Sequence, residues 1–326
     1  MRFTRLMLLL TAGALSLSSA HASKPEDAAM FTHPISMVIP FSPGGSTDPV
    51  GRIIGPHLAE ELGQAVVVEN KPGAAGALGT SYVARSAPDG HTILLNTGVV
   101  AVHPNTMKQP GYDVRTDLIP VIQMVAGPYT LIANPSAPFD SVEELVAYGK
   151  ANPEKLFYGT SGTGGSLHLI TEYFKQQTGL PMTHVPYKGN GPVVQALVGG
   201  EIQLAFDTIP GSKALSDAGR VKVLAVTSLE RHPLLPDVPT MDELGFKGFE
   251  AETWAGIFLP KGTDPAIVTR YNEAVRTVLT NEDVIKRMAD IAYSVKGNSP
   301  EEFAELIETE RERWAQTMEA AGMEAL

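Results

Sequence analysis

Glycine and hydroxyl residues gather in one short stretch of the chain, YGTSGTGGSLH, at residues 158–168. Its eleven positions hold four glycines and four serine or threonine residues, and a helical pattern follows them. The first N–H groups of a helix lack backbone partners and bear partial positive charge, and glycine lets a ligand approach them closely. The stretch therefore predicts a loop that binds an anion through N–H groups and hydroxyls, with an ordinary tight turn as the alternative.

The spacing within this stretch argues against two familiar chemistries. A nucleotide-phosphate loop has the pattern G-x-x-x-x-G-K-[ST], and here Gly159 and Gly164 have the glycine spacing but Gly165 stands where lysine is needed. A serine-hydrolase elbow has the pattern G-x-S-x-G, and Ser161 lacks the second glycine two positions later. We therefore expect an anion that is carried and released, since neutral donors bind more weakly than an arginine would.

A second stretch, PFSPGGSTD at residues 40–48, has a similar composition and also precedes a helical pattern. The backbone from Gly44 to Ser46 would present N–H groups to a ligand. Asp48 would act as the N-cap of a helix whose first residue is Pro49. A Pro-Gly turn followed by an N-cap is the alternative interpretation.

The other candidate motifs give weaker signals. GAAGALG at residues 73–79 departs from the dinucleotide spacing G-x-G-x-x-G, and we interpret it as a small-residue, closely packed lead into a helix. The seven histidines after residue 22 are scattered, so no metal site and no cofactor is expected. Asp207 follows a strand pattern beside Thr208 and is either a catalytic acid, a ligand contact or a turn residue, with the turn favoured.

The composition indicates a soluble, acidic protein. The chain has 326 residues, of which 43% are hydrophobic and 19% charged, and its net charge is −11. An acidic surface argues against nucleic acid as a partner. The absence of cysteine excludes disulfides, thiolate metal sites and a cysteine nucleophile.

Residues 1–22 have the pattern of a secretory signal peptide. Arg2 and Arg5 precede an apolar run at 6–17, and an A-x-A cleavage signal ends at Ala22. We therefore expect a protein that is exported, with the signal peptide removed near that position.

Alternating strand and helix patterns position the two glycine-rich loops. Each loop follows a strand and precedes a helix, which is where ligands bind in open α/β sheets. The order β-α-β-α-β predicts parallel sheets with right-handed crossovers. Strands are expected at 35–41, 65–69, 91–96, 118–133, 155–158, 182–185, 203–206 and 221–227, and helices at 49–62, 80–86, 141 onward, 166–178, 191–197, 265–279, 283–289 and 300–321.

At these motifs the chain resembles the tripartite tricarboxylate transporter substrate-binding proteins, which are Bug-type periplasmic solute receptors. The resemblance covers nearly the whole mature chain in the right order, and it departs at Gly51, where alanine is usual. The stretches that show it are PFSPGGSTDPVGR (40–52), YGTSGTGGSLHL (158–169), VPYKGNGPVVQALVGGEIQLAFD (185–207) and WAGIFLPKGTDPAIVTRYNEAV, which begins at Trp254.

The resemblance implies a two-lobed α/β clamshell in which each lobe is a mostly parallel sheet flanked by helices, with the ligand cleft between the lobes. Lobe I would comprise residues 23–127 and 251–326, and lobe II residues 128–250. The chain would cross between the lobes near 125–130 and 245–255.

The resemblance also implies a periplasmic receptor, not an enzyme, that captures a small organic carboxylate and delivers it to integral-membrane transporter subunits. We expect a monomer with no cofactor. The bound carboxylate would bridge the two loops and stabilise the closed form. With the loops described above, the expected ligand contacts are Phe41, Pro43, Gly44, Gly45, Ser46, Asp48, Asn96, Thr97, Ser161, Gly162, Thr163, Gly164, Ser166, His168, Tyr187, Lys188 and Asp207.

Two alternatives to a transport receptor remain open at this point. An exported hydrolase or lyase would use Asp207 with a hydroxyl nucleophile, and it would need a base within hydrogen-bond reach of that hydroxyl. A ligand-sensing protein that reports to a signalling partner would need the same two-lobed fold as a transport receptor.

Overall fold

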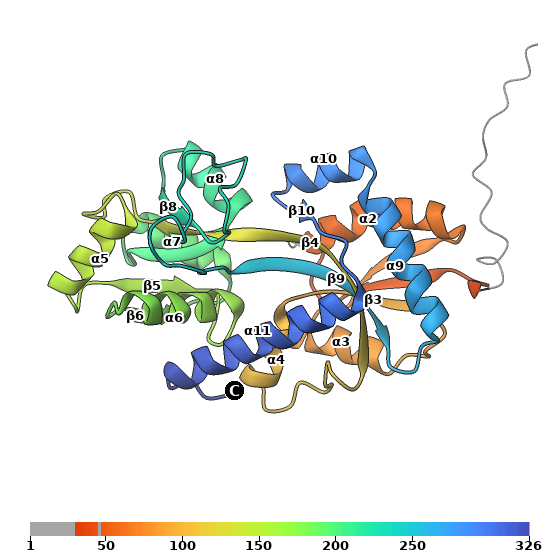
Figure 1. Ribbon diagram of the computed structural model, residues 1–326. Helices are drawn as coiled ribbons and strands as arrows, with labels where there is room; N and C mark the ends of the chain where they lie inside the picture. Colours follow the sequence, from red (N-terminus) through yellow and green to blue (C-terminus); the bar gives the residue numbers. More distant parts are fainter. Residues whose placement is uncertain (1–29, 45–46, 326) are drawn as a thin grey trace, which may run out of the picture.

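The computed structural model describes residues 30–44 and 47–325 of the chain. Figure 1 shows two lobes side by side, joined by the long strands β4 (Leu118–Ala133) and β9 (Glu252–Pro260). Helix α11 (Pro300–Ala320) runs along both lobes below these strands. The predicted signal peptide, Gly45 and Ser46 lie outside the described residues. Within the part described, no helix has the length and apolar character needed to cross a bilayer.

The first lobe is built on a mixed sheet. Strands β1 (Ile35–Ile39), β2 (Val66–Asn70) and β3 (Thr92–Thr97) are parallel, as the sequence predicts, whereas β9, β4 and β10 (Ser294–Val295) add antiparallel pairs. The helical segments of this lobe are α2 (Thr47–Leu62), η1 (Ala74–Gly76), α3 (Ala77–Ala84), α4 (Val99–Thr106), α9 (Pro265–Leu279) and α10 (Glu282–Asp290).

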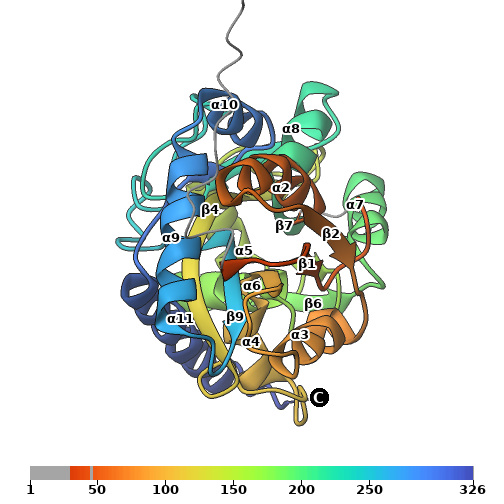
Figure 2. The same ribbon diagram turned by 90° about the vertical axis from the view of Figure 1, so that its right-hand side faces the viewer.

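Alternation along β1 divides the core of the first lobe into two layers, because successive side chains of a strand point to opposite faces. Ile35, Met37 and Ile39 pack with α2 and α9, whereas Val38 packs with α3, α4 and the first half of α11. Figure 2 shows α2 and α9 on one side of the central strands and α3 on the other.

The second lobe is also built on a mixed sheet. Strands β5 (Phe157–Thr160), β6 (Thr183–Pro186) and β7 (Leu204–Thr208) are parallel, and β8 (Lys222–Val226) pairs with β4 in the antiparallel sense. Its helices are α5 (Val142–Ala151), α6 (Ser166–Thr178), α7 (Asn190–Gly199) and α8 (Ile209–Asp217). The expected N-cap of α5 is confirmed, since the Ser141 hydroxyl accepts the Glu144 N–H at 3.1 Å.

Strand β4 belongs to both lobes and marks the first crossing. Residues up to Pro128 pair with β9, and from Tyr129 onward the same strand pairs with β7 and β8. The second crossing lies beside the first, because the Tyr129 N–H donates to the Thr227 hydroxyl at 2.8 Å and the Ala251 N–H donates to the Thr227 carbonyl at 3.1 Å. Two adjacent single-chain crossings are the geometry of a hinge.

Helix α11 is a third connection between the lobes. It starts with a capping box between Ser299 and Glu302. Phe303 packs in the core of the first lobe, whereas Trp314 and Met318 pack in the core of the second. The lobe boundaries at 127/128 and 250/251 remain predictions, and this helix contributes to both cores.

Candidate functional site

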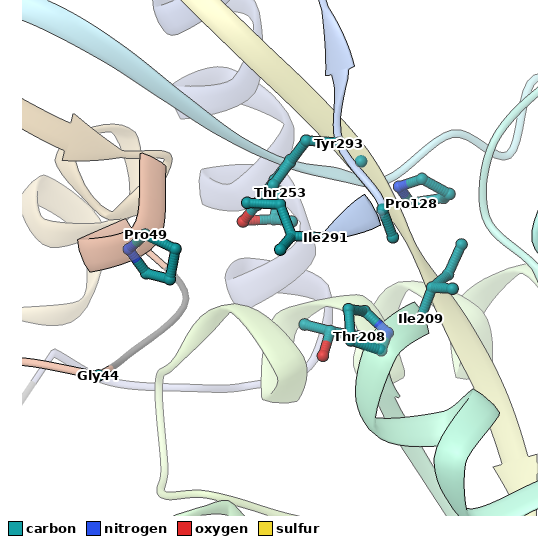
Figure 3. A pocket seen from close by; sticks show the side chains of 11 residues that line it. Gly44, Pro49, Pro128, Thr208, Ile209, Thr253, Ile291 and Tyr293 are labelled. Carbon is teal, nitrogen blue, oxygen red and sulfur yellow. The ribbon is translucent and has the colours of Figure 1, made fainter. Parts of the chain in front are cut away.

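Three neighbouring cavities form a cleft between the lobes. The first-loop cavity, of about 250 Å³, lies between Gly44 and Pro49 of the first lobe and Thr208 and Ile209 of the second. Figure 3 shows these two pairs facing each other, with Thr253 between them.

The second-loop cavity, of about 520 Å³, is lined by α4 on one side and by residues 161–166 on the other. A connecting cavity of about 30 Å³ shares Thr253 with the first-loop cavity, and shares Val102 and Ser166 with the second. None of the described residues that line the three cavities is lysine or arginine. An anion in this cleft would therefore depend on backbone N–H groups and neutral side chains.

The first loop is fixed to helix α2 by Asp48. Gly44 has a φ of +79°, and its N–H donates to Asp48 Oδ2 at 3.1 Å. Arg52 Nε donates to the same oxygen at 2.9 Å, and Asn70 Nδ2 donates to Oδ1 at 3.0 Å. The hydrogen bond from Arg52 is the main cause that lowers the pKa of Asp48 to about 2, against the opposing effect of burial. The carboxylate therefore stays ionised and fully occupied by protein donors.

Asp48 is not the N-cap that the sequence predicts. Helix α2 begins at Thr47, so Asp48 lies inside the first turn and reaches back to the loop. Phe41 is half-buried against the core of the first lobe, and its carbonyl accepts the Asn70 amide at 3.0 Å. Pro43 and Gly44 are exposed on the loop, and of these two Gly44 lines the cavity.

The second loop has a matching arrangement. Gly164 has a φ of +77°, and its N–H donates to His168 Nδ1 at 3.0 Å. Helix α6 begins at Ser166 after the N-cap Gly165, and no side chain caps it. The first N–H groups of α6 therefore lack a side-chain partner next to the cavity that Ser166 lines. Five of the predicted ligand contacts line that cavity: Ser161, Gly162, Thr163, Gly164 and Ser166.

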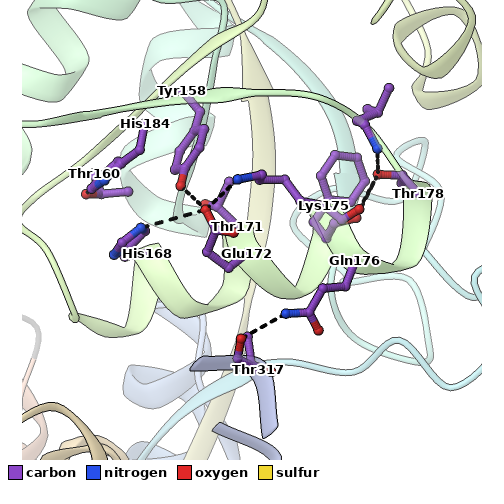
Figure 4. A network of polar contacts seen from close by, with 12 residues as sticks. Tyr158, Thr160, His168, Thr171, Glu172, Lys175, Gln176, Thr178, His184 and Thr317 are labelled. Carbon is purple, nitrogen blue, oxygen red and sulfur yellow. Dashed lines mark hydrogen bonds and ion pairs between the residues drawn. The ribbon is translucent and has the colours of Figure 1, made fainter. Parts of the chain in front are cut away.

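His168 lies behind the loop and does not line the cavity. The residue is 4% exposed and its ring stacks on His184, with the ring centroids 3.8 Å apart. His184 Nε2 lies 2.6 Å from the Thr160 hydroxyl, which donates to the Gly162 carbonyl at 2.9 Å. Figure 4 shows these side chains gathered between α6 and the neighbouring strands. Sequence reasoning missed His184, because only the strand pairing brings it close.

Asn96 and Thr97 have different roles at the end of β3. Asn96 is fully buried, where its amide donates to the Thr80 hydroxyl at 2.8 Å and its oxygen accepts the Thr97 N–H at 2.8 Å. Thr97 lines the connecting cavity. Asn96 therefore supports the wall and Thr97 forms part of it.

Asp207 is the penultimate residue of strand β7, next to Thr208, which lines the cleft. It is 3% exposed, and its Oδ1 accepts the Thr208 N–H at 2.8 Å and the Asn190 amide at 3.1 Å. Burial raises the pKa of Asp207. Tyr187 is half-buried against the α7 side of the sheet and Lys188 is exposed. None of these three predicted site residues lines the three cavities, although Thr208 does.

The GAAGALG stretch is closely packed before a helix, as predicted, but its backbone is unusual and α3 begins at Ala77, three residues earlier than expected. Residues 73–76 all have positive φ, at +140°, +47°, +53° and +98°. Positive φ is unfavourable for alanine and such strain gathers at binding sites. Ala75 lines the second-loop cavity opposite the loop. The sequence could not show this, because alanine normally favours a right-handed helix.

Two buried titratable groups stand in the wall of the cleft and were not predicted. His103 on α4 is 3% exposed and lies 2.7 Å from the Tyr112 hydroxyl through Nδ1, and burial lowers its pKa to about 4. Glu310 on α11 lines the connecting cavity and accepts the Trp254 indole N–H at 2.9 Å. Burial raises the pKa of Glu310 to about 7.

Comparison with known proteins gives a consistent result. The family model described as "Tripartite tricarboxylate transporter family receptor" matches residues 50–323. The chain is 35% identical over 325 residues to Protein BugT of Bordetella pertussis, and the match covers 99% of both chains.

Solved structures with the same fold are also close in sequence. An R. palustris protein solved with adipate has a TM-score of 0.79 and 36% identity, with 90% of this chain and 99% of that chain covered. MatC from Rhodopseudomonas palustris, solved with bound malate, has a TM-score of 0.72 and 32% identity, with 87% of this chain and 98% of that chain covered.

Proposed function

The chain belongs to the tripartite tricarboxylate transporter receptor family, and from this premise we propose that it delivers a captured carboxylate to integral-membrane transporter subunits. It is a Bug-type periplasmic solute-binding protein with a two-lobed α/β fold. The ligand is a small organic carboxylate that occupies the cleft between the lobes. Adipate and malate in the two structural relatives make C4–C6 dicarboxylates the first candidates.

One observation supports this proposal most strongly. Two loops that start helices line the cleft, one in the first-loop cavity and the other in the second-loop cavity, and both contain a left-handed glycine that is bonded to the following helix. Since no described cavity-lining residue is lysine or arginine, backbone N–H groups are the main donors that an anion would use. A dicarboxylate has one anionic group for each loop.

The predicted contacts divide into two groups under this proposal. Gly44 and the residues from Ser161 to Ser166 contact the ligand, with Thr97 and Thr208 beside them. Asp48, Asn96 and His168 hold the backbone of the cleft in place instead. Gly45 and Ser46 remain predicted contacts from the sequence alone. The mature chain starts near residue 23 and acts as a monomer.

A thermal-shift screen of residues 23–326 tests the proposal, after unfolding and refolding to remove carried ligand. The panel contains adipate, malate, citrate, aromatic acids, amino acids, and the amides of each acid that binds. At a hundred times its Kd a ligand adds about 2.7 kcal/mol of stability, which is an easily measured shift. A shift with one acid that is lost for its amide supports the proposal. A shift with a sugar or a cation and with no acid would overturn it.

The enzyme alternative is tested in the same samples. A receptor returns its ligand unchanged, so chromatography of the acid after long incubation should recover all of it. Conversion of the acid into a product would favour the hydrolase or lyase interpretation over the receptor.

A further inference from the structure

The second loop is held by two histidines whose protonation states follow from their hydrogen bonds. The Gly164 N–H is a donor, so His168 Nδ1 must accept and therefore bears no proton. The neutral ring then has its proton on Nε2, which lies 3.8 Å from Glu172 Oε1. Protonation of Nδ1 would place two donors against each other and break the bond to Gly164.

The protonation state of His184, which lies behind His168, is deduced in the same way. The Thr160 hydroxyl donates its only proton to the Gly162 carbonyl, so it must accept a proton from His184 Nε2 at 2.6 Å. The neutral His184 ring packs on His168. A second positive charge 3.8 Å from a first would be repelled, so the stack favours neutral rings.

The groups that face this pair come from three elements. Glu172 and Lys175 lie on α6, where Lys175 Nζ donates to Glu172 Oε1 at 2.8 Å. Tyr158 on β5 donates to the same carboxylate oxygen, and its ring stacks on His184. Because Lys175 and Tyr158 already bond that oxygen, Glu172 is a poor partner for an imidazolium. Across the second-loop cavity, the facing titratable group on α4 is His103.

We propose that His168, braced by His184, is the positioning residue of the second loop, and that its protonation releases the loop and thereby the carboxylate. This inference rests on the proposed function and names a regulation of the same cleft. His168 does not contact the ligand. Its neutral Nδ1 fixes Gly164 in the left-handed conformation that leaves the neighbouring N–H groups of α6 available.

Burial of the histidines decides whether acid strengthens or weakens their hold on the second loop. Burial lowers the pKa of His168, with Lys175 acting in the same direction and Glu172 opposing, and it lowers the pKa of His184 to about 4. The loop is therefore fully held above the ordinary histidine pKa of 6.5. The hold weakens as the pH falls below 6.5, because a released histidine takes up a proton and a held one does not.

Two substitutions separate the role of His168 as a hydrogen-bond acceptor from its ability to take up a proton. In His168→Asn the side-chain oxygen can accept the Gly164 N–H, yet it does not titrate. In His168→Leu the acceptor is lost at similar size. His232→Asn is the matched control, because His232 is 9% exposed and its Nδ1 accepts the Leu234 N–H at 3.2 Å, outside the three cavities.

The first experiment follows the Gly164 amide and the imidazole signals by NMR in the ligand-free mature protein, from pH 7.5 to 4.5. We expect His168 to be the Nε2–H tautomer and the Gly164 amide to shift along its titration curve. In His168→Asn the Gly164 shift should disappear, and in His232→Asn it should persist. A Gly164 amide that ignores the His168 titration, or a His168 Nδ1–H tautomer, would overturn the inference.

The second experiment measures adipate and malate affinity by calorimetry over the same pH range. Relative to His168→Asn, in which Glu310 titrates as in wild type, wild-type affinity should fall by up to roughly 30-fold between pH 7.5 and pH 5, as expected if a released histidine has a pKa of about 6.5. His168→Asn should bind at pH 7.5 and lose most of this dependence, and His168→Leu should bind weakly at every pH. Equal acid profiles for wild type and His168→Asn would refute the inference. Failure of wild type to bind any acid of the panel would instead refute the proposed function and leave the NMR result intact.

Discussion

The two glycine-rich loops use one backbone design with two different supports. Gly44 and Gly164 have φ values of +79° and +77°. Each donates its N–H to a side chain four residues later, in the first turn of the following helix, at 3.1 Å to Asp48 and 3.0 Å to His168. The left-handed glycine turns the chain, and the side chain behind it fixes the turn. The same geometry therefore appears once in each lobe.

The supports differ in charge and in their response to pH. Asp48 is an anion braced by Arg52 and Asn70, and its pKa of about 2 keeps it ionised over the whole physiological range. His168 is a neutral acceptor in a stack of histidines. One lobe therefore keeps its loop in acid and the other is expected to lose it.

Glu310→Gln should give the largest change in stability. Its pH dependence must be known before the two loops are compared by unfolding experiments. The pKa of Glu310 is raised from 4.5 to about 7 by burial, so the folded state holds a proton that the unfolded state releases. Stability should fall as the pH rises from 4.5 to 7. The variant should be more stable than wild type by about 3 kcal/mol at pH 7.5, since each pKa unit is worth about 1.4 kcal/mol.

Urea unfolding at several pH values measures this effect. The two proteins should have equal stability near pH 4.5, because the Gln amide can accept the Trp254 N–H as the protonated carboxyl does. If the variant is less stable than wild type at pH 7.5, then Glu310 is ionised in a favourable site. Helix α11, which packs in the cores of both lobes, would then add its own pH dependence to the unfolding free energy of both.

Gly164→Val should give the largest change in binding. Valine is strained at a φ of +77°, and its Cβ would lie 3.4 Å from Thr106 on α4. We expect adipate or malate affinity to fall at least 100-fold, which is about 2.7 kcal/mol. Gly179→Val is the matched control, because Gly179 has a φ of +67°, lies at the far end of α6, and has open space around its Cβ position.

Both glycine variants should lose about 1–2 kcal/mol of unfolding free energy, because a side chain is unfavourable in this conformation. Only Gly164→Val should lose the ligand-induced thermal shift. Equal loss of the shift in both variants would mean that general destabilisation, and not the shape of the loop, controls binding.

The sequence predicts the loops better than it predicts their supports. Glycine next to serine and threonine before a helix is a local signal, so both loops and most strands are recognised from the chain alone. The stacking partner of His168 is not local, because His184 lies on a neighbouring strand and meets it only through the pairing of β5 with β6. Sequence position marks His168 as a ligand contact, but it cannot show that the ring lies behind the loop.

Two further features depend on tertiary structure. The left-handed Ala74 and Ala75 contradict the helical preference of alanine, and they persist because the turn is held on both sides by glycine and by packing against Phe41. Strand β4 is readable as an apolar run, but its exchange of partners at Tyr129 is visible only in the sheet.

Asp48→Ala tests the first loop at a smaller scale. Removal of the carboxylate leaves the Gly44 N–H without its acceptor, which should cost about 1–2 kcal/mol of unfolding free energy and weaken adipate or malate binding. The wild-type contribution should be present above pH 3.8 and lost as the pH falls toward 2, because the pKa of this group is depressed in the folded state. Denaturant unfolding across the acid range and calorimetry measure the two effects.

Asp242→Ala is the matched control for this variant. Asp242 accepts the Gly248 N–H at 2.8 Å and the Lys247 ammonium at 2.8 Å, yet it lines none of the three cavities. It should lose stability without any change in ligand affinity. If Asp48→Ala also keeps full affinity, the first loop does not depend on its support and the parallel between the lobes fails.

Arg52→Gln should have the smallest effect on ligand affinity. It tests whether Asp48, like His168, orients its loop as a hydrogen-bond acceptor and not through its charge. Arg52 is 53% exposed, so its ion pair with Asp48 is screened by solvent, and the Asp48 carboxylate keeps its bonds to Gly44 and Asn70 without it. The pKa of Asp48 should rise toward 3.8 in a ¹³C carboxyl titration, while ligand affinity at pH 7.5 changes less than about twofold, because exposed pairs contribute little. If Arg52→Gln instead weakens binding as much as Asp48→Ala, charge and not acceptor geometry orients the first loop. The neutral His168 in the second lobe could not then orient its loop in the same way.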